Sequence, residues 1–253
     1  MEPVLKVQAL HKHFNVRAGL FSSKPFNALS DVSFCLGKSE TLAIIGETGS
    51  GKSTLGKILA GAEQSSSGQI LLNGQIIEDD GGRTVNSKDI RLIFQDPMKS
   101  LNPSNTIGSI LNEILVLNTE LDSQARREKI NQTLLNVGLL AEHRNYYAHM
   151  FSGGQIQRVA LARAIILDPK VLVLDEALSS LDPSVRAQTV NLLLRLQRET
   201  GLSYVLITNH LSLVKHMSDS LLLLHKGKVV EYGGTNDIFS NPQTKLAERM
   251  LAS

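Results

Sequence analysis

The sequence predicts an α/β domain built around a mostly parallel core sheet. Short apolar runs that suit buried strands alternate with segments of helical periodicity, which is the pattern of parallel α/β folds. Two departures from this alternation add detail: the first third of the chain reads as strands and turns, and the stretch around 98–160 reads as helices. We therefore expect a single domain over 1–253, with an N-terminal antiparallel β subdomain and an inserted α-helical subdomain.

The N-terminal third is predicted to be antiparallel. The segments "LKVQAL" (5–10) and "LSDVSFCL" (29–36) alternate apolar and polar residues, or nearly so. In "GQILLNGQII" (68–77) the pair Asn73-Gly74 separates two apolar arms, which is a strong hairpin signal. The polar stretch "EDDGGRTVNSKD" (78–89) is interpreted as a surface loop.

The core strands and one helix can be delimited from the pattern. Buried strands are predicted from short apolar runs at 41–46, 90–94, 171–175 and 203–208. The last two strands are expected within 220–234. A helix over 183–200 has Asp182 as a candidate N-cap, Pro183 at its first position and Gly201 after its end.

Composition and charge limit the possible partners. Hydrophobic residues make up 42% of the chain, charged residues 20%, and the net charge is +2, so no nucleic-acid partner is expected. The longest apolar runs, such as "LLLL" at 221–224, fall far short of the roughly 20 residues that span a bilayer, and the start of the chain does not read as a signal peptide. Cys35 is the only cysteine, which excludes an intramolecular disulfide or an all-cysteine metal cluster and fits a reducing cytoplasm.

A glycine-rich stretch forms a candidate phosphate-binding loop. "GETGSGKST" follows an apolar strand and precedes a helical segment, as the pattern G-x-x-x-x-G-K-[ST] requires. Its glycines let successive N–H groups point at phosphate oxygens, and the helix N-terminus adds partial positive charge. Lys52 is expected to reach the β- and γ-phosphates and the Ser53 hydroxyl to ligate Mg²⁺, whereas the alternative is a glycine-rich turn without a ligand. The candidate nucleotide-binding residues are Gly46, Glu47, Thr48, Gly49, Ser50, Gly51, Lys52, Ser53 and Thr54.

Two acids follow the predicted strand "VLVLD". Asp175 and Glu176 stand at the carboxyl end of this strand, and in open parallel sheets that end faces the ligand crevice. Asp175 is placed to hold Mg²⁺ through water, and Glu176 is placed to polarise an attacking water. The pair could instead cap the next helix, but beside a phosphate loop it indicates a nucleotide-hydrolysing site.

The stretch "FSGGQIQRVALARA" (151–164) carries a family resemblance. Ser152 can cap the following helix, with Gln155 completing a capping box, and Gly153 and Gly154 leave backbone N–H groups bare at a positive helix end. After a phosphate loop, this stretch resembles the signature sequence of ABC-type ATPases, which are P-loop NTPases. The resemblance covers essentially the whole chain and implies ATP and Mg²⁺ as cofactors. It also implies that Ser152 to Gln155 bind the γ-phosphate held by a second ABC ATPase subunit, arranged head to tail with the first.

Other positions of the family match one at a time. Gln95 in "FQDP" resembles the glutamine that touches Mg²⁺ and senses the membrane subunit, and Asp182 in "SSLD" resembles the D-loop aspartate. Phe14 resembles the aromatic residue that stacks on adenine, although it could equally belong to the core. Phe26 is a weaker candidate for the same role.

Within the family, the chain most resembles the ATP-binding subunits of oligopeptide and dipeptide transporters. The shared stretches are "ALSDVSF", "IFQDPMKSLNP" and "YYAHMFSGGQIQR". Ala177, where most of those subunits carry proline, and the triplet "TNH" bring the chain closest to Sap-type peptide-uptake systems. The resemblance implies a peptide importer with integral-membrane permease subunits. This chain would then be peripheral, at the cytoplasmic face of the inner or plasma membrane, and docked through its helical subdomain with Gln95 at the hinge.

The end of the strand "SYVLIT" leaves two readings open. Members of the family present a switch histidine here to the γ-phosphate and the attacking water, and the residue in register is Asn209 rather than His210. Asn209 can hydrogen-bond a phosphate but cannot become a cation or relay a proton. His210 would need a local bulge, because a one-residue shift reverses the facing of side chains in a strand. The uninterrupted register favours Asn209, and both residues are kept as catalytic candidates.

Three functions compete at this point. The leading hypothesis is a transport ATPase in which ATP closes a dimer, hydrolysis opens it, and the motion drives the permease. A soluble ABC protein of translation or DNA repair is the first alternative, but such proteins usually carry two fused ATPase domains or a long coiled-coil insertion, and this chain shows neither. The second alternative is a regulatory subunit that binds ATP and hydrolyses it weakly, and only Asn209 supports it.

Overall fold

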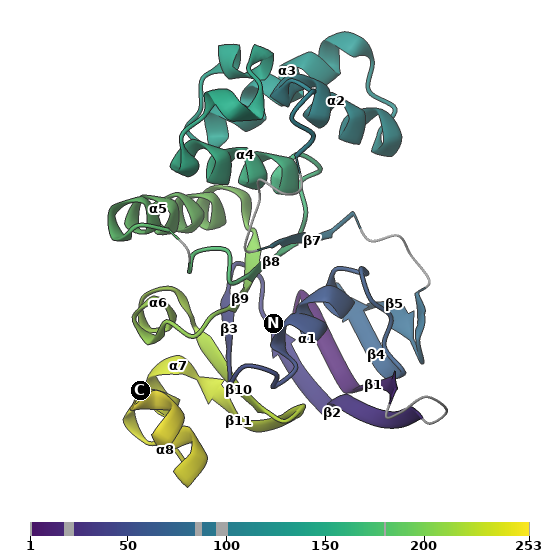
Figure 1. Ribbon diagram of the computed structural model, residues 1–253, viewed down its shortest axis with the longest axis vertical. Helices are drawn as coiled ribbons and strands as arrows, with labels where there is room; N and C mark the ends of the chain where they lie inside the picture. The colour runs from purple at the N-terminus through teal and green to yellow at the C-terminus, as the bar shows by residue number, and fades with distance from the viewer. Residues whose placement is uncertain (1, 18–22, 84–87, 95–100, 180, 253) are drawn as a thin grey trace.

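The structure is a computed structural model that describes residues 2–17, 23–83, 88–94, 101–179 and 181–252. This part of the chain forms two sheets with helices packed on them (Figure 1). Among the helices described, none combines the length and the apolar composition that crossing a membrane requires.

The N-terminal sheet is antiparallel, as predicted. Its strands run in the order β2-β1-β4-β5-β6, where β1 is Leu5–Arg17, β2 Ser23–Leu36, β4 Ser67–Leu72, β5 Gln75–Asp79 and β6 Gly82–Arg83. The predicted hairpin is formed by β4 and β5, and Asn73 and Gly74 between them have φ angles of 48° and 76°. A two-residue type I′ turn requires positive φ at both positions, and asparagine and glycine adopt it most easily.

The core sheet is mostly parallel, which confirms the predicted fold class. Its order is β11-β10-β3-β9-β8-β7, and its strands are β3 Thr41–Ile45, β7 Ile90–Ile93, β8 Val171–Asp175, β9 Ser203–Ile207, β10 Ser220–His225 and β11 Lys228–Gly234. Every neighbouring pair is parallel except β10 with β11. Strands β3, β8 and β9 are buried at every position, which explains their unbroken apolar runs.

Helices cover both faces of the core sheet (Figure 1). On one face, α1 (Lys52–Leu59) shares an apolar core with the antiparallel sheet. On the other face pack α5 (Pro183–Thr200) and α6 (Leu211–Met217). Two short helices, α7 (Thr235–Ser240) and α8 (Lys245–Leu251), pack against β10 and β11. The carboxyl ends of β3, β8 and β9 are left at one edge, where the candidate site lies.

The helix α5 has the predicted bounds, but its cap differs from expectation. Pro183 is its first residue, and Gly201 ends it in the left-handed region with φ 74°. Asp182 occupies the N-cap position, yet its side chain makes no capping hydrogen bond. This residue is exposed, so water solvates the carboxylate in place of the helix N–H groups.

The helical subdomain lies at one end of the molecule, at the top of Figure 1. It consists of α2 (Ile107–Asn118), α3 (Ser123–Asn136) and α4 (Gly153–Ile165), with two short 3₁₀ turns at Ala141–Asn145 and Ala148–Met150. Thr106 caps α2 and Asp122 caps α3 through side-chain hydrogen bonds to backbone N–H groups. The predicted helical insertion is therefore present from 107 onward, and 98–100 lie outside the described residues.

The prediction of a surface loop over 78–89 was wrong for its first part. Glu78 belongs to β5 and is fully buried, and Arg83 belongs to β6. The Glu78 carboxylate accepts hydrogen bonds from the Arg83 guanidinium at 3.0 Å and from the Ser65 N–H at 2.8 Å. Arg83 also donates to the carbonyl oxygens of Ile58 and Leu59, so its charge ties the end of α1 to the antiparallel sheet. The polar residues of this stretch predicted an exposed loop, whereas the charges of Glu78 and Arg83 are paired inside the fold.

Candidate nucleotide site

The phosphate loop joins β3 to α1 and forms the floor of a cavity of about 480 Å³. This cavity is also lined by residues from four other parts of the chain: β1, β2 and the segments that follow β8 and β9. Its lining comprises Phe14, Phe26, Ala28, Thr48, Gly49, Gly51, Lys52, Ser53, Thr54, Glu176 and Asn209. The fold thus brings together the aromatic, phosphate-loop, acidic and switch candidates that the sequence separates widely.

Two of the loop glycines are required by the close approach of other backbone. A Cβ at Gly46 would lie 2.2 Å from the carbonyl oxygen of Leu224, which excludes any side chain. Gly51 has φ 107°, and a Cβ there would lie 2.5 Å from the carbonyl oxygen of Ala28. The loop backbone therefore packs closely against β10 and β2, and only glycine fits at positions 46 and 51.

Lys52 lies inside this loop. Its side chain is buried, and its Nζ donates to the carbonyl oxygens of Gly46 at 2.6 Å and Glu47 at 3.0 Å. Burial lowers the pKa of Lys52, while the nearby carboxylates of Glu176 and Asp175 act in the opposite direction. The arrangement holds an ammonium group inside the phosphate loop, beside the cavity, which suits a phosphate.

Ser53 and Asp175 provide oxygen donors for a hard cation. The Ser53 Oγ donates to Asp175 Oδ1 at 3.1 Å, so the hydroxyl and the carboxylate are adjacent. Burial raises the pKa of Asp175, with the Glu176 charge adding to this and the Ser53 hydrogen bond opposing it. A hydroxyl and one carboxylate beside bound phosphates are the donors that Mg²⁺ uses in nucleotide sites, so these residues fit that ion. A nearby cation would favour the ionised form of Asp175.

Glu176 adopts an unusual backbone conformation at the end of β8. Its φ is 52°, in the left-handed region, and its N–H donates to the carbonyl oxygen of Ile207 at 3.0 Å. Such strained conformations cluster at functional sites. Its carboxylate accepts a hydrogen bond from the Ser179 hydroxyl. Ser179 opens the stretch "SSLD" (179–182) that resembles the D-loop, in which only Asp182 was predicted to be a site residue, although a hydroxyl residue three positions after an acid is a recognisable local hydrogen-bonding pattern.

Asn209, and not His210, lines the cavity. Asn209 is exposed, and it also lines a second cavity of about 440 Å³, with Glu47, Leu211 and Arg249 among its walls. His210 stands at the N-cap position of α6, and its N–H donates to the Thr208 Oγ1 at 3.1 Å. The assignment of the switch role to Asn209 stays a prediction.

The strand that leads to Asn209 is regular. β9 pairs with β3 and β8 without a register shift, and the Thr208 N–H continues the pairing to Ile44 at 3.3 Å. The bulge that His210 would need is absent from these described strands.

The two aromatic candidates lie opposite each other on β1 and β2. Phe14 and Phe26 are paired in register, and both line the cavity. The Lys12 Nζ lies 4.7 Å from the centroid of the Phe14 ring, and that ammonium is also paired with Glu63 at 2.6 Å. Phe26 is 52% exposed. The Phe14 ring therefore already contacts a cation. The Phe26 ring is exposed and is more accessible to a ligand than a weaker candidate was expected to be.

The signature residues lie away from this cavity. The predicted capping box is confirmed: Ser152 Oγ accepts from the Gln155 N–H at 3.4 Å, and Gln155 Oε1 accepts from the Ser152 N–H at 2.9 Å. Gly153 is exposed, and a Cβ there would meet nothing within 4 Å. None of the residues from Ser152 to Gln155, nor Asp182, lines the cavity. Gln95 lies outside the described residues.

Known proteins are similar to this chain in fold and in sequence. The family model "ABC transporter" matches residues 29–179. SapF of Escherichia coli K12, a putrescine export system ATP-binding protein, and SapF of Salmonella typhimurium, a peptide transport system ATP-binding protein, are each 47% identical over 252 residues, covering 100% of this chain and 94% of their own length. The dipeptide transport ATP-binding protein DppF of Haemophilus influenzae is 45% identical over 254 residues, covering 99% of this chain and 78% of its own. The solved structure of cbiO1 from Clostridium perfringens, part of the ABC transporter complex cbiONQ, has a TM-score of 0.77 at 25% identity and covers 99% of both chains.

The chain therefore belongs to the ABC transporter family. It is an ATPase of this family, of the type found in oligopeptide and dipeptide transporters and similar to SapF, as its sequence predicted. The predicted P-loop NTPase fold is confirmed as well.

Proposed function

We propose that this chain is the ATP-hydrolysing subunit of a peptide importer and works at the cytoplasmic face of the membrane. The observation that carries the proposal is the single cavity in which Lys52, Ser53, Glu176 and Asn209 meet, in a chain that matches transport ATPases over its whole length. The same full-length match disfavours a soluble ABC protein of translation or DNA repair.

We propose the following roles within the site, which its geometry supports. The loop N–H groups and Lys52 bind the phosphates, and the loop backbone positions them without rearrangement. Ser53 and Asp175 would hold Mg²⁺, which neutralises phosphate charge when it is bound. Glu176 accepts a proton from the attacking water, and Asn209 donates a hydrogen bond to the γ-phosphate. The Phe14–Phe26 pair presents an aromatic surface for adenine.

A second ATPase subunit is needed to complete the site. The α4 N-terminus, with Gly153 and Gly154 after the cap residue Ser152, offers backbone N–H groups and partial positive charge away from this chain's own nucleotide cavity. Such a helix end is suited to the γ-phosphate of another copy or of a sister ATPase. We propose a head-to-tail dimer in which each signature closes the partner's nucleotide site, with Asp182 near the interface.

The cargo is the least constrained part of the proposal. The two SapF relatives carry names with different cargo and direction, putrescine export and peptide transport. DppF, named for dipeptide transport, agrees with the peptide. The test is reconstitution of the chain with its membrane subunits in vesicles, where peptides rather than putrescine should stimulate ATP hydrolysis and accumulate on the ATP side. Stimulation by putrescine alone, with transport away from the ATP side, would contradict peptide import.

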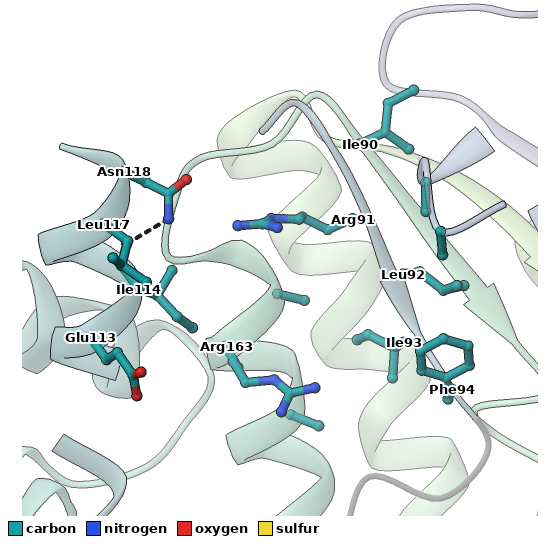
Figure 2. Close-up of a pocket in the computed structure, with 14 residues that line it drawn as sticks. Ile90, Arg91, Leu92, Ile93, Phe94, Glu113, Ile114, Leu117, Asn118 and Arg163 are labelled. Carbon is teal, nitrogen blue, oxygen red and sulfur yellow. Dashed lines mark hydrogen bonds between the residues drawn. The ribbon is translucent and has the colours of Figure 1, made fainter. Parts of the chain in front are cut away.

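A groove between the core sheet and the helical subdomain supports a permease partner (Figure 2). Its volume is about 460 Å³, and its walls come from β7, α2 and α4. Apolar side chains stand exposed at this groove: Leu117 is 75% and Phe94 44% exposed. Exposed apolar surface beside a groove is typical of a binding surface for another protein.

The groove also holds a guanidinium with unused hydrogen-bonding capacity. Figure 2 shows the Arg91 side chain extending from β7 toward Asn118 at the end of α2. Its Nε is buried and makes no hydrogen bond to any residue that the structure describes. Burial lowers the pKa of Arg91, and its charge also acts against that of Arg163 across the groove. An incoming permease segment that combines apolar residues with one carboxylate would satisfy this group.

Arg91→Glu should therefore detach the chain from its membrane subunits. The substitution places a carboxylate where the partner is expected to bring one, so the amount of permease that co-purifies should fall by about tenfold or more. ATP binding by the isolated chain should not change, because Arg91 lies outside the nucleotide cavity. The exposed Arg198→Glu on α5 is the matched control. Co-purification of Arg91→Glu at the parental level would contradict docking at this groove.

The switch assignment gives a separate prediction. If Asn209 faces the γ-phosphate, His210→Ala should leave the hydrolysis rate nearly unchanged, and Asn209→His should raise it, because a histidine adds a group that can carry charge and relay a proton. Rates should be measured with the partner ATPase present. If His210 is the switch, His210→Ala should instead cost on the order of a hundredfold, as for loss of a positioned catalytic group. A parental rate that stays very low even with partners would favour the regulatory, weakly hydrolysing subunit.

A further inference from the structure

We propose that Lys12 is a positioning residue for the adenine base: its ammonium holds the Phe14 ring and ties that ring to the helix that follows the phosphate loop. The inference rests on the proposed function, because that function assigns the Phe14–Phe26 pair the role of an aromatic surface for adenine. It adds a residue that does not itself line the nucleotide cavity.

The Lys12 ammonium makes three contacts. Its Nζ lies 4.7 Å from the centroid of the Phe14 ring, and it donates to Glu63 Oε1 at 2.6 Å and to the Gln64 carbonyl oxygen at 2.7 Å. The Lys12 side chain is only 11% exposed, so water competes little for the ammonium. The hydrogen bond from Lys12 lowers the pKa of Glu63, and the carboxylate therefore stays ionised and paired at neutral pH.

A cation over one face of an aromatic ring favours stacking on the other face. The faces of aromatic rings carry partial negative charge, which opposes the stacking of one ring directly on another. The Lys12 ammonium attracts the π electrons of Phe14 toward itself and so reduces that charge on the opposite face. Because the ammonium covers one face and Phe14 lines the cavity, the base can stack only on the face that Lys12 leaves free.

Lys12 also connects the strand that carries Phe14 to the helix that follows the phosphate loop. Its two oxygen partners, on Glu63 and Gln64, come directly after α1 in the chain. The Glu63 N–H donates back to the carbonyl oxygen of Lys57, in the last turn of α1, at 3.3 Å. The ring and the phosphate loop are therefore linked through a short series of hydrogen bonds.

Ser66 holds the backbone of β1 on both sides of Lys12. Its N–H donates to the His11 carbonyl oxygen at 2.8 Å, and its hydroxyl accepts from the His13 N–H at 3.1 Å. The segment after α1 thus binds the backbone of β1 through Ser66 and the ammonium of Lys12 through its two neighbouring residues. This arrangement restricts where the ammonium can lie, and with it the Phe14 ring.

The first test compares two ligands of the chain, ATP and inorganic triphosphate, each with Mg²⁺, by calorimetric titration. Lys12→Met should weaken ATP binding by about 3- to 10-fold, as for loss of one cation–π contact, and should leave the affinity for triphosphate, which has no base, within about twofold. Lys12→Arg keeps a cation over the ring and should restore ATP binding. Lys6→Met, a partly buried lysine on the same strand, is the matched control and should change neither affinity.

The second test asks whether Lys12 acts through Phe14. Phe14→Ala should weaken ATP binding, and adding Lys12→Met to it should cause little further loss. Glu63→Gln keeps the lysine but removes its charged partner, so it should weaken ATP binding less than Lys12→Met does and leave triphosphate binding unchanged. If Lys12→Met does not fold, the Glu63→Gln variant decides, because Glu63 is more exposed and its amide keeps the shape of the carboxylate.

The two ligands separate the possible outcomes. The proposal is overturned by a Lys12→Met chain that binds ATP as the parent does, by equal losses for ATP and triphosphate, by an arginine variant as weak as the methionine variant, or by losses at Lys12 and Phe14 that multiply. If Lys12→Met does not fold, parental ATP binding by Glu63→Gln overturns it. A parent chain that binds triphosphate as tightly as ATP would count against the adenine surface of the proposed function itself, and that result is distinguishable because it requires no variant.

Discussion

Glu176→Gln is expected to lower the rate of ATP hydrolysis by about two to four orders of magnitude, which is the usual contribution of a general base. The amide has nearly the shape of the carboxylate and can still accept the Ser179 hydrogen bond, but it cannot take a proton from water. Nucleotide binding should persist, because Lys52, Ser53 and the loop backbone are unchanged. The substitution therefore separates hydrolysis from binding.

The same variant should accumulate as an ATP-bound dimer. If hydrolysis is what opens the proposed head-to-tail dimer, a chain that cannot hydrolyse ATP stays closed. Phosphate release measures the rate, and size-exclusion chromatography with and without ATP measures assembly. Glu199→Gln, an exposed position near the end of α5, is the control. A near-parental rate, or a protein that stays monomeric with ATP and with any co-encoded sister subunit, would contradict the role of Glu176 or the dimer.

The parts of the fold that could be predicted are those determined by residues that are adjacent in the sequence. The hairpin at Asn73-Gly74 follows from the positive φ angles that these two residues tolerate. The helix from Pro183 to Thr200 follows from its proline and from the glycine after its end. The phosphate loop could be predicted as well, because its glycines and the strand and helix on either side are adjacent in the chain.

The parts that could not be predicted depend on contacts between distant segments. The sequence around Glu78 predicts a loop, because nothing in it shows that Arg83 pairs with Glu78 and bonds the end of α1. In the sequence, Ser179 is one hydroxyl residue among several, and only the folded structure brings Arg186 to its carbonyl oxygen. The facing of Asn209 rather than His210 could be argued from register alone, because side chains alternate along a strand and β9 continues regularly into this turn.

The second large effect is expected at the phosphate loop. Lys52→Met should weaken binding of ATP with Mg²⁺ by about 10- to 100-fold, because a charge-assisted contact to phosphate contributes about 1.5–3 kcal/mol. Calorimetric titration with ATP measures the affinity. Lys57→Met is the matched control, an exposed lysine on the same helix. An affinity within twofold of the parent would show that Lys52 does not touch the phosphates.

Loss of folding is the competing explanation for weak binding by this variant, and the structure separates the two. Lys52 is buried, and burial lowers its pKa, which means that the charged side chain is held in the loop at a cost to stability. Methionine fills a similar volume without that cost, although the carbonyl oxygens of Gly46 and Glu47 lose their donor. The melting temperature of Lys52→Met without nucleotide should therefore stay close to that of the parent, while the rise in melting temperature on adding ATP should be much smaller. A variant that melts far below the parent before any nucleotide is added would mean that Lys52 is needed for folding, and its weak binding would then follow from the loss of folding rather than from a lost phosphate contact.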